Sequence, residues 1–541
     1  MCPVEGTIDW PELELEIPAE SPSAVEMPAF GSWLDVARRN RTALDGADVR
    51  IGGIRLSDLR RRARAETLAL AAAYTRALGI AEPLGGAMPG TAAPQGPSDL
   101  LLCTGHQPVL VHPGIWIKYL AMARLVPAGG VGLNLIVDSD ALDEVAAEVP
   151  RSNGRLARAR VPMASAGPDV PAESLAAPDP DRWRAFVAAV DGHMATLHEP
   201  ALADAWGRAR LLPAPPAHLG LPGALSAFRR ALEGPRPYLD LPVSHLSRSE
   251  AFRRFALAIF TDARRFAEVH NACLASYREH YGIRTGAQPF PDLTIDGARV
   301  ETPFWYVADG RRMPLSVDVR AGRLLTNGDA VAPLPVGPED AGFAAIRPRA
   351  LTLTAFARLA LADLFIHGIG GGRYDRATDA IVRAFFGLTP PVYATVTATL
   401  FLPFSGGGRA DEERRRLHRL LLDLQHNPDR FLSADGPHQE LVKEKWALIR
   451  RLDDASSMMR RERRQATQRI REINLILQVT VANQVADVQE ELRRIDARHQ
   501  DAEVTDYRGY PFFLFPAEAI DGLVDLLARR PAAAQADRVC G

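Results

Sequence analysis

The stretch LLCTGHQPVLVHPGIWIKYL, residues 101–120, joins an apolar run to an amphipathic run through the polar turn Thr104–Gln107. The next apolar run, VGLNLIV at 131–137, leads directly into Asp138-Ser139-Asp140. A strand, a helix and a second strand over about 37 residues have the size of a βαβ unit. Such connections are right-handed and join parallel strands. The stretch therefore predicts an α/β fold whose core is a parallel sheet.

The remainder of the chain suggests how this core is interrupted. A second α/β block lies at about 346–403 and contains the glycine-rich break Ile366–Tyr374. Proline-rich linkers at 163–182 and 211–223 flank a helical insertion, and alternating runs around Asp309-Gly310 indicate a hairpin. We expect an N-terminal extension at 1–30, a Rossmann-like core at 31–405, a helical coiled-coil arm at 406–503 and a C-terminal segment at 504–541. The core should be interrupted by a connecting insertion at about 150–285 and a β-hairpin segment at about 295–335.

The arm is predicted from a regular apolar seam on a long charged helix, at about 457–498. Apolar residues recur at positions 466, 470, 473, 477, 481, 485, 488, 492 and 495. Spacings of three and four residues with one four-residue stutter are typical of a coiled coil. A partner helix must cover this seam, from the same chain or from a second one. We expect a homodimer; the alternative is a long amphipathic helix packed on a core.

Composition excludes several classes of protein. The net charge is −2, so no overall field attracts nucleic acid or an anionic membrane surface. No run of 18 apolar residues occurs, and the acidic N-terminus lacks the pattern of a signal peptide. The four cysteines are scattered, which indicates neither a disulfide framework nor a zinc site. These features predict a cytoplasmic protein that binds neither nucleic acid nor membrane.

Lysine is rare in this chain, which draws attention to Lys118. Only three of the 64 basic residues are lysines, and the other two, Lys443 and Lys445, lie in the C-terminal third. Arginine would serve for bulk surface charge, whereas lysine is a compact charge whose pKa can be tuned. Lys118 is thus a candidate for neutralising an anionic ligand; the alternative is an ordinary surface lysine.

Three short segments carry candidate chemistry. The turn Thr104-Gly105-His106-Gln107 lies where open α/β sheets bind ligands, and its amides and glycine favour a close anion; His106 could equally be a structural histidine. Asp138 and Asp140 could act as a general base, bind an amine or hold Mg²⁺, or could cap the following helix. The glycines Gly370, Gly371 and Gly372 precede a helix and could form an anion cradle or a tight turn.

The order of these segments resembles the bacillithiol-biosynthesis cysteine-adding enzyme family, the cysteine ligases acting on glucosaminyl-malate. That family has a TGQQ-type loop, a glycine-proline helix entrance, an Asp-His-Asp motif, a late Arg-Pro segment and a GGPGE-type turn. The matching segments are Thr104–Gln107, His112–Gly114, Asp138–Asp140, Arg347-Pro348 and Ile369–Gly372. The similarity covers roughly residues 100–405, and the helical arm also fits.

The resemblance implies a Rossmann-like core and a ligase that adds cysteine, or a similar amino acid, to a small acidic acceptor. ATP, with Mg²⁺, would activate a carboxylate. In that scheme Thr104, Gly105 and Gln107 bind substrate oxygens, Gly370, Gly371 and Gly372 bind the cofactor's phosphates, and Asp138, Asp140 and His106 are catalytic. Lys118, Arg347 and Tyr374 complete the substrate-binding set.

Two departures from the family keep other functions open. Ser139 stands where the motif has histidine, and Arg373-Tyr374 replaces the acidic end of the glycine-rich turn. These changes favour, as one alternative, a dimeric binding or scaffold protein that has lost catalysis. A nucleotide-dependent transferase with another substrate is the second alternative.

Overall fold

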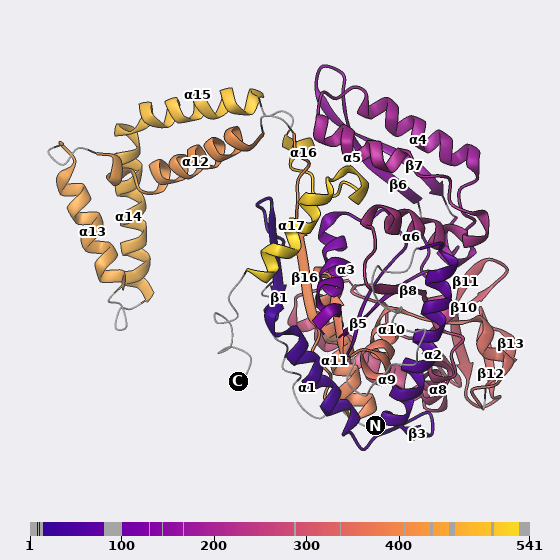
Figure 1. Ribbon diagram of the computed structural model, residues 1–541. Coiled ribbons are helices and arrows are strands. Elements are labelled where there is room, and N and C mark those ends of the chain that lie inside the picture. Colours follow the sequence, from indigo (N-terminus) through magenta and orange to yellow (C-terminus); the bar gives the residue numbers. More distant parts are fainter. Residues whose placement is uncertain are drawn as a thin grey trace. The chain divides into compact units, whose positions relative to one another are not determined.

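The computed structural model (Figure 1) describes residues 8, 10, 15–80, 100–128, 130–142, 144–165, 167–285, 288–335, 337–404, 407–432, 436–453, 460–498 and 502–529. The chain divides into two compact units. The larger comprises residues 1–151, 158–402 and 508–541, and the smaller comprises residues 152–157 and 403–507. The larger unit holds every candidate site residue, so most of the description concerns it.

Six strands form the main sheet of the larger unit, in the order β1-β16-β15-β4-β5-β8. Their bounds are Ser23–Met27 for β1, Ala394–Thr399 for β16, Leu364–His367 for β15, Leu100–His106 for β4, Gly130–Ile136 for β5 and Tyr238–Pro242 for β8. Strand β1 is antiparallel to β16, and all other neighbouring pairs are parallel. The prediction of an α/β fold with a mostly parallel sheet is therefore confirmed.

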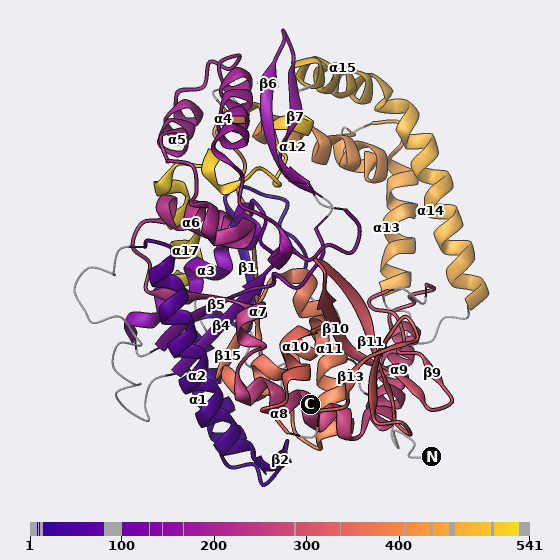
Figure 2. The same cartoon turned by 90° about the vertical axis from the view of Figure 1, so that its right-hand side faces the viewer.

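One face of this sheet carries the main apolar core. Side chains alternate along a strand, so Leu101 and Cys103 of β4 point the same way, and both belong to one buried cluster with Leu133 and Leu135 of β5. Helices that contribute to this cluster include α1 (Trp33–Asp45), α2 (Leu56–Ala77), α8 (Glu250–Thr261), α9 (Ala263–His280), α10 (Ala350–Phe356) and α11 (Ile369–Ile381). Helices α10 and α11 contact each other and are neighbours in Figure 2.

Two crossovers leave the centre of the sheet in opposite directions. From β4 the chain passes through α3 (Pro113–Leu125) to β5, on one side. From β15 it passes through α11 to β16, on the other side. Because both connections follow the right-handed rule, α3 and α11 are expected on opposite faces. Among the described residues α3 indeed takes no part in the cluster that α11 joins, and it packs instead with α17 (Ala517–Ala528). The gap between β4 and β15 is thus the topological switch point, where open α/β sheets bind ligands.

The expected hairpin segment belongs to a second, antiparallel sheet. Its strand order is β13-β12-β11-β10-β14, with β9 paired to β10. The bounds are Ile295–Asp296 (β9), Arg299–Ala308 (β10), Arg311–Asp318 (β11), Arg323–Thr326 (β12), Asp329–Pro333 (β13) and Ile346–Pro348 (β14). The Asp309-Gly310 turn joins β10 to β11, as the alternating pattern indicated.

Parts of the chain expected to lie outside the core contribute to it. The N-terminal extension supplies β1, the C-terminal segment supplies α17, and the insertion at about 150–285 supplies β8. The other helices and strands of the larger unit are β2 (Arg50–Ile51), β3 (Ile54–Arg55), α4 (Pro180–Met194), α5 (Pro200–Arg210), α6 (Gly220–Glu233) and α7 (Val243–Leu246). The paired strands β6 (Glu144–Ser152) and β7 (Leu156–Ser165) also belong to it, except for their adjoining ends within residues 152–157. Strands as short as β1 and β8, with five residues each, carry too little pattern to be assigned to a sheet from sequence.

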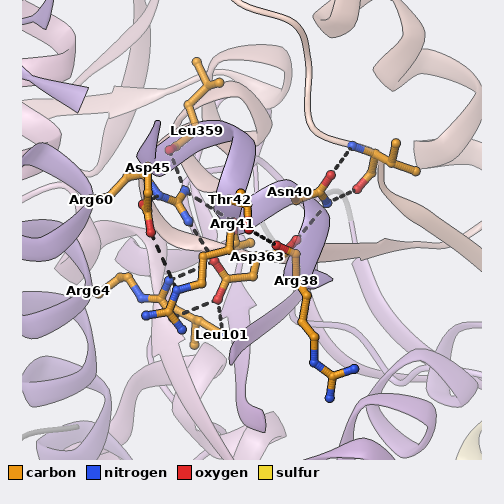
Figure 3. Close-up of polar contacts among 12 residues, drawn as sticks. Arg38, Asn40, Arg41, Thr42, Asp45, Arg60, Arg64, Leu101, Leu359 and Asp363 are labelled. Carbon is orange, nitrogen blue, oxygen red and sulfur yellow. Dashed lines mark hydrogen bonds and ion pairs between the residues drawn. The ribbon is translucent and has the colours of Figure 1, made fainter. Parts of the chain in front are cut away.

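At the amino ends of β4 and β15, a buried carboxylate joins the sheet to its helices (Figure 3). Asp363 is fully buried and accepts hydrogen bonds from Arg60 at 2.7 Å, from Arg64 at 2.9 Å and from the backbone nitrogen of Leu101 at 2.8 Å. Asn40 of α1 donates to the backbone oxygens of Asp363 and Val392. This cluster lies at the opposite end of the strands from the switch point, so its role is structural.

The smaller unit is helical. Its helices are α12 (Gly407–His426), α13 (Gln439–Asp453), α14 (Arg460–Thr480), α15 (Ala482–Arg498) and α16 (Ala502–Thr505). Helix α12 packs against α15, and α13 packs against α14. Seam residues Ile473, Leu477 and Val481 are buried, whereas the side chain of Ile495 lies outside the described set. The same chain therefore covers much of the seam.

The predicted long helix is divided at Val481, where α14 ends and α15 begins. The division falls within three consecutive four-residue spacings, from Ile473 to Val485. Each such step advances the apolar stripe by about 40° beyond a full turn. The apolar stripe therefore rotates around the helix axis. In α14 it packs mainly against α13, and in α15 it packs against α12.

Candidate functional site

A cavity opens at the switch point, between the carboxyl ends of β4 and β15. Its volume is about 230 Å³, just below the range of about 300–1,000 Å³ typical of small-molecule pockets. The lining residues are Gly105, His106, His112, Gly114, Ile115, Lys118, His367, Gly368, Ile369, Gly370, Gly371, Thr397 and Arg508. We call this the switch-point cavity. A larger cavity of about 530 Å³ near Leu78 and Phe228 is lined almost entirely by apolar residues and proline, with one arginine, so it has little chemistry to offer.

One wall of the switch-point cavity is the start of α11. The N-cap is Gly368, and no side chain caps this helix. The first intrahelical bond runs from the Gly372 nitrogen to the Gly368 oxygen at 2.9 Å, so the preceding amides have no acceptor within the helix. A Cβ on Gly371 would lie 2.7 Å from Nδ1 of His367, which excludes a larger residue. Uncapped amides beside glycine are the usual surroundings of a bound anion.

Two basic side chains, those of Lys118 and Arg508, line the cavity, and no acidic side chain lies among its described lining residues. Lys118 is 2% exposed, and its Nζ donates to the Gly105 oxygen at 2.7 Å. Burial, and secondarily the charge of Arg229, lowers the pKa of Lys118 to about 7. Arg508 donates from Nη2 to Thr397 Oγ1 at 3.1 Å and to the Ala398 oxygen at 2.9 Å. Among the described residues that line the cavity there is no Asp or Glu. The cavity therefore favours an anion.

The start of α3 forms the opposite wall, and a histidine caps it. Nδ1 of His112 accepts from the Gly114 nitrogen at 3.1 Å. Burial, then the charges of Arg508 and Lys118, lowers the pKa of His112 to about 4, so this acceptor is uncharged at neutral pH. A Cβ at Gly114 would lie 2.3 Å from Nη2 of Arg508. Glycine at this position thus makes room for the guanidinium.

His106, the predicted catalytic histidine, also lines the cavity. Its Nδ1 lies 3.0 Å from the Gln107 oxygen. Burial, followed by the charge of Lys118, lowers the pKa of His106 to about 3. A histidine with so low a pKa is a weak proton acceptor at neutral pH.

His367, which the sequence analysis did not single out, is better arranged for proton transfer. It ends β15, and its Nε2 lies 2.9 Å from Oδ2 of Asp375. Burial opposes ionisation of Asp375, but Arg358 and His367 outweigh it and hold the Asp375 pKa below its ordinary value. An ionised Asp375 keeps the ring proton on Nε2 and leaves Nδ1 as a base. Within the described part of the chain no hydrogen-bond donor or acceptor engages that Nδ1.

The acidic pair differs from expectation because protein groups bind both carboxylates. Strand β5 ends at Ile136, so Asp138 and Asp140 lie in the following turn rather than on a strand. Asp138 accepts from the Ser244 nitrogen at 2.9 Å and from its Oγ at 2.5 Å, at the start of α7. Burial raises the pKa of Asp138 to about 7, although both Ser244 bonds oppose that rise. Asp138 thus caps a helix, but a different one from the helix expected.

Asp140 and Gln107 belong to the same polar network beside the cavity. Asp140 accepts from Gln107 Nε2 at 2.9 Å and pairs with Arg312 at 3.1 Å. Next to it, Arg347 is buried and donates to both oxygens of Glu173, at 2.9–3.2 Å. The Glu173 nitrogen in turn donates to the Asp138 oxygen at 2.8 Å. Arg347 is therefore neutralised by the protein itself.

The predicted residues fall into three groups. Gly105, His106, Lys118, Gly370 and Gly371 meet around the switch-point cavity. Gln107, Asp138, Asp140 and Arg347 form the adjacent network. The remaining three serve elsewhere: Thr104 donates to the Ile366 oxygen at 2.8 Å within the sheet, Gly372 lies against Thr395, and Tyr374 is 41% exposed beside Phe290.

Sequence reasoning missed His367 and Arg508. His367 had a signal, since it ends a short apolar strand immediately before a glycine-rich helix start, as Gly105-His106 does on β4. Arg508 had none, because it follows a helical unit of about a hundred residues before the chain rejoins the sheet.

Comparison with known proteins adds no family to this geometry. No protein-family model matches the chain, and no curated protein matches it in sequence. Of the helices in the described residues, none is long and apolar enough to cross a membrane. The functional argument therefore depends on the site alone.

Proposed function

We propose that this chain is a ligase that joins cysteine, or a similar amino acid, to a small acidic acceptor such as glucosaminyl-malate, in low-molecular-weight thiol biosynthesis. The observation that carries the proposal is the switch-point cavity, where two cations and uncapped helix amides lie beside a histidine fixed by a carboxylate. Amide ligation needs these two things together: a site for anionic oxygens and a proton acceptor for the attacking amine.

ATP is the proposed source of activation, as its magnesium complex. The residues present fit a phosphate group, because Lys118, Arg508 and the amides of Gly370 and Gly371 converge on one small cavity. At about 230 Å³ the cavity suits a phosphate or carboxylate group rather than an enclosed nucleotide. In the described part of the chain no group of three or more His, Cys, Asp and Glu could hold a metal ion, so Mg²⁺ would arrive with the phosphates. ATP supplies the leaving group that activates the carboxylate.

The chain's own residues would then position the amine and remove its proton. The amine nitrogen would bond to the activated carboxyl carbon, and phosphate or AMP would leave with the bridging oxygen and the electron pair of the broken C–O bond. Nδ1 of His367 takes the proton from the amine, while Asp375 stabilises the imidazolium through Nε2. Lys118 and Arg508 stabilise the charge of the departing group.

The test is a ligation assay with the purified protein. Incubation with Mg-ATP, cysteine and glucosaminyl-malate should give AMP or ADP together with an amide-linked product, detected by mass spectrometry. Each substrate is left out in turn as the control. Nucleotide release without the amide product would instead indicate a nucleotide-dependent transferase or hydrolase. Neither nucleotide release nor product, over a range of amino acids and acidic acceptors, would contradict the proposal.

One observation favours a second candidate, a binding or scaffold protein without catalysis. Asp138 and Asp140, the predicted catalytic pair, are both bound by protein groups. A scaffold would bind the nucleotide or the acceptor and show no turnover. The ligation assay combined with a binding measurement separates the two functions.

The finer structural predictions belong to the same proposal. The strand order around the crevice supports a Rossmann-like core, and the paired helices of the smaller unit support a coiled-coil arm. A homodimer and a cytoplasmic location stay predictions. Leu475, Ile476 and Val479 of α14, which are 63%, 44% and 76% exposed, are aliphatic residues next to the seam that a second copy could cover.

A further inference from the structure

Lys118 is a buried cation whose charge no carboxylate offsets. Its side chain comes from the middle of α3, and within the described residues its hydrogen bond goes to the Gly105 oxygen. Among the described residues no carboxylate lies within 4.0 Å of Nζ, whereas other buried cations such as Arg60 and Arg358 have one. Burying an unpaired charge is costly unless a partner arrives from outside the protein. The cavity beside it is the place such a partner would occupy.

The described side chains around Lys118 supply no negative charge that would balance it. The charged and titratable groups that face it from neighbouring elements are Arg229 of α6, His106 of β4, His112 at the start of α3, His367 of β15 and Arg508. Both His106 and His112 are uncharged at neutral pH, and the charge of Arg229 opposes protonation of Lys118. The described carboxylates behind these groups are already bound within the protein, Asp375 by His367 and Arg358, and Asp240 and Glu233 by Arg229.

We propose that the switch-point cavity binds a tetrahedral dianion, a phosphate group or its sulfate analogue, and that binding draws a proton onto Lys118. The dianion is held by Lys118, Arg508 and the first amides of α11. On binding, Nζ takes up one proton from solvent, and no bond of the dianion is made or broken. This inference deepens the proposed function by naming the group that the cavity takes, yet it can be measured with no ligation at all.

The direction of the pH dependence follows from the lowered pKa of Lys118, about 7. Below that value Nζ already carries its proton, so a dianion binds without proton uptake. Above it the protein must take up a proton to bind, so affinity falls by about tenfold per pH unit. Sulfate stays fully ionised between pH 6 and 9, so any proton taken up when it binds goes to the protein and not to the ligand.

The experiment is calorimetric titration of the full-length protein with sulfate, in buffers of different ionisation enthalpy. Uptake should approach about one proton per sulfate at pH 8 and fall close to zero at pH 6. Lys118→Arg should keep much of the binding but lose the proton uptake, because arginine stays charged. Lys118→Met should weaken binding about tenfold or more. Lys443→Met, at a lysine whose side chain is 66% exposed, is the matched control and should behave as wild type.

Several outcomes would overturn the inference. These are sulfate binding without proton uptake at pH 8, affinity unchanged in Lys118→Met with its melting temperature kept, and no sulfate binding at all. Proton-coupled sulfate binding in a protein without ligation would overturn only the proposed function. Ligation without the coupling would overturn only this inference.

Discussion

Replacing Asp363 by alanine is expected to lower the free energy of unfolding of the larger unit by about 3–5 kcal/mol, the cost of breaking a buried ion pair from one side. Asp363 is fully buried and offsets the charges of Arg60, which is 1% exposed, and Arg64. It also accepts from the Leu101 nitrogen, at the start of the central strand β4. The variant therefore removes the buried carboxylate that Arg60, Arg64 and the Leu101 nitrogen share, although Arg60 keeps its bond to the more exposed Asp45. Chemical denaturation followed by fluorescence measures the change.

Asp35→Ala is the matched control for this prediction. Asp35 pairs with Arg38 on the surface of α1, and both side chains are more than half exposed. Exposed pairs contribute about 0–1 kcal/mol, so this variant should unfold close to wild type. A similar, small change in both variants would show that the Asp363 cluster does not hold α2 and β15 together.

Replacing His367 by glutamine is expected to lower kcat of the ligation reaction by about a hundredfold or more, the usual contribution of a general base. Glutamine can still donate from its amide to Asp375, as Nε2 of His367 does at 2.9 Å. It has no basic nitrogen in place of Nδ1. The structural bond is thus kept while the proton acceptor is removed, and KM for ATP should change far less than kcat.

His280→Gln is the control, because this histidine is exposed at the end of α9. It should retain wild-type kcat and melting temperature. A second comparison uses His106→Gln, since His106 lines the same cavity but has no carboxylate partner among the described residues. If His106→Gln loses far more kcat than His367→Gln, the base has been assigned to the wrong histidine.

The fold was predictable from sequence where the pattern was local. Two apolar runs separated by an amphipathic segment predicted β4, α3 and β5, and the pairing of β4 with β5 is parallel as expected. The position of β15 between β4 and β16, and of β1 at the edge, was not predictable, because pairing between distant strands leaves no trace in either strand's own sequence. The switch point depends on that distant pairing.

The site residues, too, were predictable where their signal was local and not where it depended on distant partners. Gly105, Lys118 and the glycines of α11 were found because strand ends and helix starts have local signals. The role of Asp138 could not be foreseen, since its partner Ser244 lies 106 residues away on α7. The same holds for the partnership of Arg347 with Glu173, 174 residues apart. Whether a polar group is free for a ligand depends on such distant partners.

The central claim is that the switch-point cavity is the anion site of an enzyme, and a crystal soaked in selenate tests it most directly. Selenate has the shape and charge of sulfate, and its anomalous scattering identifies the ion without ambiguity. We predict an anomalous selenium peak in this cavity, with selenate oxygens within hydrogen-bond distance of Nζ of Lys118 and of the amides of Gly370 and Gly371, and no such peak in crystals of Lys118→Met. Selenate bound elsewhere on the protein, with this cavity holding none, would contradict the claim.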